Sequence, residues 1–108
     1  MRVTIDGPSF ETAALCVPIL RALPGWFGIE AAVIQYAREI DHLLTWHASD
    51  VARVCGFVSI KQHTPYVAEI YVMGVLPDRH RTGIGRALLL QLQAWLRQQE
   101  VEYLQVKT

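Results

Sequence analysis

The most informative segment of the chain reads VLPDRHRTGIGRAL and spans residues 75–88. The run before it, Val67–Val75, is rich in Val, Ile and Tyr, which predicts a strand. The residues after it predict a helix over Gly85–Gln99, with an apolar face formed by Leu88, Leu92, Trp95 and Leu96. The segment therefore joins the carboxyl end of a strand to the amino end of a helix, where unpaired backbone N–H groups and the helix dipole can bind an anion.

Glycines and arginines make this junction suited to a phosphate group. Gly83 and Gly85 let the backbone approach a ligand without a Cβ in the way. Three arginines against one aspartate leave a local charge of +2 over Arg79, Arg81, Arg86 and Asp78. A Walker A loop is excluded because the GK[ST] element is missing, and a Rossmann loop is disfavoured because Leu88 takes its third glycine position. The alternative is an ordinary helix start with solvated arginines, and the charge cluster at a strand-to-helix junction favours the phosphate site.

Hydrophobic periodicity and turn residues predict the remaining elements. The expected strands are Arg2–Ile5, ended by Asp6-Gly7-Pro8, then His42–His47, Ala52–Ile60 and Tyr103–Val106. A helix is expected to start at Phe10 after a Ser9 cap, to kink or restart at Pro18 and to end by Leu23-Pro24-Gly25. A second helix is expected over Ile29–Ile40, and Lys61–Pro65 is expected to be a polar loop.

This order of elements predicts an α+β domain that occupies residues 1–108. The strand, helix and strand from Val67 to Val106 form a right-handed parallel βαβ unit. The three strands before the last helix are joined by short loops and are expected to be antiparallel. The sheet is therefore mixed and mostly antiparallel, with flanking helices.

Length and composition exclude several classes of protein. A chain of 108 residues that is 52% apolar and 19% charged forms one domain and is not disordered. Ten basic and ten acidic residues balance, so we expect no nucleic-acid partner. No apolar run approaches the roughly 18 residues of a membrane helix, and we expect a cytoplasmic protein without a membrane partner. The cysteines, Cys16 and Cys55, are expected to be reduced core thiols. No metal is expected, because His42, His47 and His63 lack ligand spacing and read as ordinary strand or loop residues.

Residues 68–89 resemble the central motif of the GNAT N-acetyltransferases. That motif has a strand ending in Val-x-Pro, a Gln/Arg-x-x-Gly-x-Gly/Ala loop and a long helix. Val75-Leu76-Pro77, Gly83-x-Gly85 and Ala87-Leu88-Leu89 match these three parts in turn. His80 departs from the family's Gln or Arg, and the change is mild because the family uses mostly backbone N–H groups there. The order of elements extends the resemblance over nearly the whole chain, although only this motif is specific.

The resemblance implies acetyl-coenzyme A as co-substrate. Its pyrophosphate would be held by backbone amides of His80, Arg81, Thr82, Gly83, Ile84, Gly85 and Arg86. Its pantetheine arm would pair along the strand at Met73, Gly74 and Val75. This arrangement needs a splayed gap between that strand and the last one.

Glu69 is the candidate general base. It is the only charged residue in Val67–Val75, and a period of two places it on one face with Val67, Tyr71 and Met73. Partial desolvation on such a face would raise the pKa of its carboxyl group toward that of a useful base. Some GNAT enzymes have a base Glu in the matching strand, and Ala68-Glu69-Ile70 aligns with it. The alternative is a solvated Glu69 or one paired with an arginine.

Two further expectations concern the acceptor and the end of the chain. Trp26 and Phe27 lie between the first two helices, where GNAT enzymes often build the acceptor pocket; the alternative is an aromatic pair that seals the core. The family's later helix, which often carries an acid Tyr, and the strands after it would follow Thr108, so the fold is expected to be C-terminally truncated and the acid stays unassigned. The last strand then has an unpaired edge, through which we expect a homodimer.

The function that this resemblance implies is N-acetyl transfer from acetyl-coenzyme A to an amine on a small molecule or peptide. The alternative is a catalytically inactive coenzyme-A-binding or interaction module that lacks the C-terminal part of the fold. A third interpretation is an anion-binding domain unrelated to coenzyme A.

Overall fold

A computed structural model describes residues 3–23 and 29–106 of the chain. In chain order the elements are β1 (Thr4–Ser9), α1 (Ala13–Arg21), α3 (Glu30–Ile40), β2 (Leu44–Ser49), β3 (Val54–Thr64), β4 (Val67–Val75), a 3-10 turn (Pro77–Arg79), α4 (Ile84–Gln98) and β5 (Tyr103–Val106). The described strands form one sheet in the order β1-β2-β3-β4-β5. Neighbours are antiparallel except β4 and β5, which are parallel. The predicted order of elements and the mixed, mostly antiparallel sheet are confirmed.

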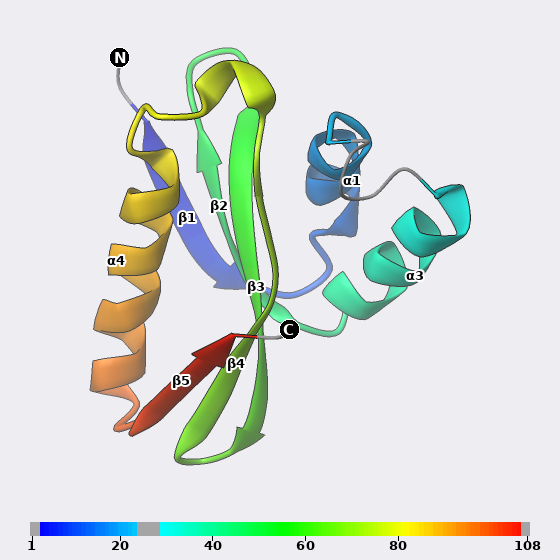
Figure 1. The fold of residues 1–108 in the computed structure, drawn as a ribbon. Helices are drawn as coiled ribbons and strands as arrows, with labels where there is room; N and C mark the ends of the chain where they lie inside the picture. The colour runs from blue at the N-terminus through cyan, green and yellow to red at the C-terminus, as the bar shows by residue number, and fades with distance from the viewer. Residues whose placement is uncertain (1–2, 24–28, 107–108) are drawn as a thin grey trace.

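Helices cover both faces of the sheet (Figure 1). Helix α4 lies on one face, where the rings of Trp95 and of Trp46 in β2 pack edge to face with their centroids 5.4 Å apart. Helices α1 and α3 lie on the other face, where the rings of Tyr36 in α3 and Tyr71 in β4 pack edge to face with their centroids 5.7 Å apart. The core therefore has two halves, one on each side of the sheet.

Helix α4 forms where its apolar period predicts. Ile84, Leu88, Leu92 and Leu96 recur every four residues and are buried against the sheet. Burying each of these side chains contributes roughly 1.5–3 kcal/mol. The helix begins one residue earlier than predicted, at Ile84, with Gly83 as its N-cap residue.

The start of the chain differs from the prediction. Asp6-Gly7-Pro8 does not end the first strand, because β1 continues to Ser9 and pairs with Thr45 of β2 across a bulge. The helix begins at Ala13 rather than Phe10, because its cap comes from a distant residue. The Asp41 carboxylate accepts a hydrogen bond from the Ala13 N–H at 3.0 Å, which leaves Ser9 without the predicted capping role.

Helix α1 passes through Pro18 without a restart. Proline removes one hydrogen bond from the helix interior. The neighbouring side chains of Cys16, Ile19 and Leu20 are fully buried, and their packing outweighs that loss. Both cysteines are buried free thiols, as predicted, and burial raises the pKa of Cys16 to about 12.

The segment predicted as a polar loop belongs to a strand. Strand β3 extends to Thr64, and Lys61 faces Glu69 of β4 in the register. Only Pro65 and Tyr66 separate the two strands. The polar side chains of this segment predicted a loop. It is a strand because its backbone N–H and C=O groups pair with β4, and this pairing does not depend on the side chains.

Strand β5 is an edge of the sheet as described. It pairs with β4 from Tyr103 to Val106, and no described strand pairs with its other side. Tyr103 and Val106 are 65% and 64% exposed. An exposed apolar edge can pair with a second copy in a two-fold contact.

We therefore expect the 108-residue chain to dimerise or form larger species at high micromolar concentration in sedimentation experiments. Val106→Lys should shift it toward monomer, because a charge on an edge strand opposes pairing. A wild-type chain that stays monomeric at that concentration would contradict the prediction.

Candidate active site

Strands β4 and β5 are paired along the first half of β4. Their register runs from Val67↔Tyr103 to Ile70↔Val106, where the described part of β5 ends. The rest of β4, Tyr71–Val75, has β3 on one side and no described strand on the other (Figure 1). We call the side of β4 beyond the described pairs the β4–β5 gap. The predicted splaying of the two strands stays a prediction, because residues 107–108 lie outside the described part of the chain.

A β-bulge in β4 lies where the gap opens. Ser59 of β3 faces Val72, and the next residue, Ile60, faces Ile70, so Tyr71 is the extra residue of a bulge in β4. A bulge of this kind bends the strand and increases its twist. The bulge also corrects the prediction of which residues share a face of β4. Tyr71 packs against Tyr36 of α3. Met73 points to the opposite face, where its Cε would lie 3.4 Å from a Cβ built on Gly85 of α4. Glu69, Tyr71 and Met73 therefore do not share one face.

The carboxyl end of β4 is fixed by its packing. A Cβ on Gly74 would lie 3.2 Å from both Ile19 of α1 and Phe57 of β3, so glycine lets α1 pack closely here. Met73 and Val75 are half-buried on either side of Gly74. The Val75 carbonyl oxygen accepts a hydrogen bond from the His80 Nε2 at 2.8 Å. This bond connects the following loop to the end of the strand.

The loop from Leu76 to Gly83, which we call the β4–α4 loop, delivers the chain to α4 with unpaired amides. The Ala87 N–H donates to the Gly83 carbonyl at 2.9 Å. The N–H groups of Ile84, Gly85 and Arg86 precede this bond and have no partner within the helix. Gly83 has φ +86°, and a Cβ added to it would meet nothing within 4 Å. The helix start is therefore open on this side.

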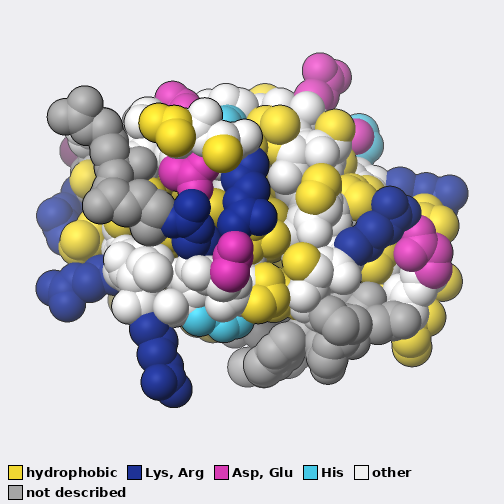
Figure 2. Space-filling view, turned by 90° about the horizontal axis from the view of Figure 1, so that it is seen from above, with side chains coloured by type: hydrophobic (Ala, Val, Ile, Leu, Met, Phe, Trp, Pro, Cys, Tyr) yellow, Lys and Arg dark blue, Asp and Glu magenta, His cyan; other side chains and the backbone are white. Residues whose placement is uncertain are grey.

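Two ion pairs bind the β4–α4 loop to the β2–β3 turn. Arg79 pairs with Asp50, and Arg53 pairs with Asp78 at 2.5 Å. Asp50 also accepts the backbone N–H groups of Ala52 and Arg53 at 2.8 and 3.0 Å. The Ala52 N–H is the largest of several causes that lower the pKa of the Asp50 carboxyl group. Basic and acidic side chains meet on this end of the molecule (Figure 2).

These pairs refine the predicted charge cluster. Arg79 and Asp78 are committed to the β2–β3 turn and do not face a ligand as free charges. Arg81 and Arg86 are exposed, and within residues 3–23 and 29–106 neither forms an ion pair. The positive charge available to an anion at the start of α4 therefore comes from these two arginines.

Asp50→Asn should loosen the β4–α4 loop. With acetyl-coenzyme A as the co-substrate that the resemblance implies, we expect its KM to rise roughly 2–10-fold, with kcat little changed. Because folding lowers the pKa of Asp50 below its ordinary value of 3.8, its stabilising effect is present above that pH and is lost as the pH falls below it. Melting curves should therefore separate the variant from wild type at pH 7 and converge in acid. Glu102→Gln, at an exposed carboxylate before β5 that takes part in none of the ion pairs of the described residues, should change neither quantity.

Glu69 lies one register step before the last described pair of β4 and β5. Its side chain is 17% exposed, and its Oε1 lies 2.8 Å from the His63 Nε2 of β3. The Gln105 Nε2 of β5 donates to the same oxygen at 3.3 Å. The carboxylate is partly exposed and paired, with a histidine and a glutamine rather than with the arginine of the predicted alternative. Glu69 and Val75 are six residues apart, about 20 Å along the strand, so an extended ligand could reach from the start of α4 to this carboxylate.

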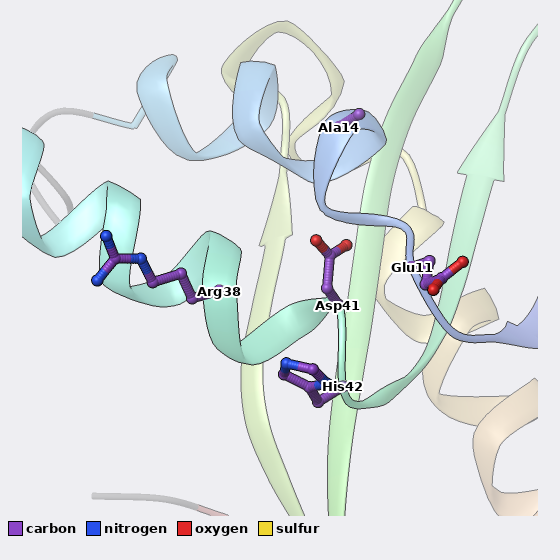
Figure 3. Close-up of a pocket in the computed structure, with 5 residues that line it drawn as sticks. All are labelled: Glu11, Ala14, Arg38, Asp41 and His42. Carbon is purple, nitrogen blue, oxygen red and sulfur yellow. The ribbon is translucent and has the colours of Figure 1, made fainter.

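The acceptor side is only partly described. Trp26 and Phe27 lie outside the described residues, and their predicted role stays a prediction. A hollow of about 440 Å³ lies where β1 leads into α1 and α3 leads into β2, lined by Glu11, Ala14, Arg38, Asp41 and His42. Its Asp41 carboxylate points toward the start of α1, and the Arg38 guanidinium points away from it (Figure 3). This hollow shares no residue with β4 or the β4–α4 loop, and its carboxylate serves as a helix cap.

Sequence reasoning missed the two partners of Glu69. The expected polar loop over Lys61–Pro65 contains His63, and Gln105 is not among the predicted site residues. The turn at Pro65-Tyr66 offered a signal, because a tight hairpin there brings His63 and Glu69 onto adjacent strands. Within the described residues, no group of three or more His, Cys, Asp or Glu side chains is placed to hold a metal ion. No helix in the same residues is long and apolar enough to cross a membrane.

Comparison with solved structures finds the same fold in acetyltransferases. The aminoglycoside N-acetyltransferase AAC(6')-Iy, solved with a bisubstrate analogue, is 18% identical, with a TM-score of 0.75 over 100% of this chain and 80% of that one. The paia N-acetyltransferase of Thermoplasma acidophilum, solved with coenzyme A, is 20% identical, with a TM-score of 0.73 over 94% and 76%. The ribosomal-protein-alanine N-acetyltransferase of Brucella melitensis is 19% identical, with a TM-score of 0.71 over 99% and 80%. These likenesses show the fold.

Sequence comparison supplies the family. No curated protein matches the chain. Residues 19–108 match the acetyltransferase (GNAT) family, a span that contains α3, all the strands but β1, the β4–α4 loop and α4. The match covers most of the chain and includes the motif at residues 68–89, so this chain belongs to the acetyltransferase (GNAT) family.

Proposed function

We propose that this chain transfers an acetyl group from acetyl-coenzyme A to a primary amine of a small molecule or peptide. The observation that carries the proposal is the β4–β5 gap. It begins near Glu69 at the last described pair with β5, runs along Val72–Val75, which no described strand pairs on that side, and ends at the open start of α4. The candidate anion site, the strand edge and the carboxylate therefore lie in sequence along β4. An extended substrate with a pyrophosphate at one end and an acyl thioester at the other would need this order of features.

Acetyl-coenzyme A would bind along this line as a substrate. Backbone amides from His80 to Arg86 would hold its pyrophosphate, with Arg81 and Arg86 contributing charge. The pantetheine arm would hydrogen bond to the free edge at Met73, Gly74 and Val75 like an added strand. Coenzyme A or a bisubstrate analogue is present in the solved structures of two of the relatives, which supports this choice of ligand.

Glu69 would act as the general base of the transfer. Its carboxylate takes a proton from the acceptor amine, and the nitrogen attacks the carbonyl carbon of the thioester. A C–N bond forms, the C–S bond breaks, and coenzyme A leaves as its thiolate, which then takes up a proton. Backbone N–H groups on the free edge of β4 would polarise the carbonyl.

The acceptor is an amine, and its size is open between a small molecule and a peptide. Relatives with the same fold are named for an aminoglycoside and for a ribosomal-protein alanine, which span both kinds. Trp26 and Phe27 are proposed to contact the acceptor, since they lie on the connection between α1 and α3.

Titration calorimetry with coenzyme A tests the binding half of the proposal. We expect saturable binding to one site, and competition by desulfo-coenzyme A, which lacks only the thiol. Binding of free pyrophosphate as tightly as coenzyme A would contradict the proposal. That result would favour an anion-binding domain unrelated to coenzyme A.

A further inference from the structure

The Glu69 carboxylate is hydrogen bonded to side chains of both strands that flank β4. The His63 Nε2 lies 2.8 Å from Oε1, and the Gln105 Nε2 lies 3.3 Å from the same oxygen. His63 belongs to β3 and Gln105 to β5. Two nitrogen groups from opposite sides therefore converge on one oxygen atom.

The backbone places both partners by specific features. In β3, Gln62 faces Ala68 and Thr64 faces Val67, so His63 is the extra residue of a bulge. A bulge re-aims its side chain, and here the ring reaches Glu69 across the sheet. In β5, Gln105 is the register partner of Glu69, one step before the last pair, Ile70↔Val106. Both hydrogen bonds to Glu69 therefore lie next to the last described pair of β4 and β5, Ile70↔Val106.

We propose that His63 and Gln105 are positioning residues, which hold the Glu69 carboxylate in the orientation that proton transfer requires. The inference rests on the proposed function and deepens it. A glutamate's last torsion is broad and unrestrained in isolation, so an unsupported carboxylate samples many directions. Two donors on Oε1 remove that freedom, and a misplacement of about 1 Å at a reacting centre can cost ~10²-fold in rate.

His63 is the stronger of the two supports. Its distance to Oε1 is shorter, and the contact is charge-assisted when the ring is protonated. Lys61, the register partner of Glu69 on β3, adds a second positive charge on that strand. Gln105 is neutral and its bond is longer, so its removal should have the smaller effect.

The test compares His63→Ala with His63→Gln. His63→Ala should lower kcat about 10-fold or more, less than loss of the base itself (~10²–10⁴-fold). The KM for acetyl-coenzyme A should stay unchanged, because the β4–α4 loop is not touched. His63→Gln should recover most of kcat, since a glutamine amide can donate to Oε1 from a similar position. Gln105→Ala should lower kcat less, and His42→Ala, at an exposed histidine of another segment, should have no effect.

Double variants separate positioning from a general structural effect. In a Glu69→Gln background, His63→Ala should cause no further loss of kcat, because a residue that acts through Glu69 has nothing left to position. An additive loss would overturn the proposal. So would a fully active His63→Ala in an enzyme that Glu69→Gln inactivates, an outcome that leaves the proposed function standing.

A readout without activity completes the test. The imidazole ¹⁵N resonances of His63 should move between wild type and Glu69→Gln in NMR spectra, because the hydrogen-bond acceptor changes. Unchanged resonances would overturn the positioning role even where acetyl transfer proceeds. A wild type that transfers no acetyl group to any amine, with the resonances shifting as expected, would instead refute the proposed function and with it the catalytic meaning of the contact.

Discussion

Glu69→Gln should lower kcat by roughly 10²–10⁴-fold, the span for the loss of one acid–base group. Glutamine keeps the size and hydrogen-bonding capacity of the side chain but cannot accept the proton of the amine. Affinity for coenzyme A should hardly change, because Glu69 lies six residues before Val75, where the β4–α4 loop begins. Steady-state kinetics and calorimetry on the same preparation measure the two effects.

Glu102→Gln is the matched control for this substitution. Glu102 is an exposed carboxylate just before β5, and its replacement should leave kcat and affinity unchanged. Normal turnover by Glu69→Gln would mean that the base lies elsewhere or that the amine loses its proton to bulk water.

Gly83→Val should weaken coenzyme A binding by ~10-fold or more. The residue has φ +86°, which a β-branched side chain tolerates only with strain of about 1–3 kcal/mol. The new side chain also projects into the open space beside the first amides of α4, where the pyrophosphate is proposed to bind. A loss of 1.4 kcal/mol corresponds to about tenfold in affinity.

Gly83→Asn separates strain from obstruction. Asparagine tolerates positive φ better than other side chains, so the loop keeps its shape while the added side chain still enters the site. We expect both variants to lose affinity, with circular dichroism showing that they remain folded. Unchanged affinity in a folded Gly83→Val protein would contradict the placement of the pyrophosphate.

The core elements were predictable because local pattern and tertiary packing agree there. Val67–Val75 and Tyr103–Val106 have the predicted bounds, and α4 is shifted by one residue. In α4 one apolar period describes both the local conformation and the buried face, whereas Val67–Val75 was recognisable as a strand from its Val, Ile and Tyr content. The open start of α4 followed from the strand-to-helix junction, because such a junction exposes backbone amides wherever it occurs.

Errors arose where a distant residue decides the local structure. Asp41 caps α1 from 28 residues away and moves its start to Ala13, which no local signal near Phe10 contains. Pairing with β4 extends β3 through residues that look like a loop. The bulges at Tyr71 and His63 break the alternation of two strands, and a sequence read with a period of two cannot reveal them.

The candidate site was predictable in part for the same reason. The loop residues and Glu69 stood out by residue type and position in a motif. The ion pairs of Asp50 with Arg79 and of Arg53 with Asp78 join segments far apart in sequence, and so do the contacts of Glu69 with His63 and Gln105. The roles of Glu69, Met73–Val75 and the loop residues stay predictions until binding and turnover are measured.

Release of coenzyme A from acetyl-coenzyme A across a panel of amines, followed by thiol titration, tests the central claim most directly. The panel should include aminoglycosides, polyamines and peptides with free amino termini. We expect at least one amine to give release that saturates with both substrates, yields one acetylated amine per thiol and is lost in Glu69→Gln. Tight, saturable coenzyme A binding with no amine-dependent release would contradict the claim and identify the chain as a coenzyme-A-binding module without transferase activity.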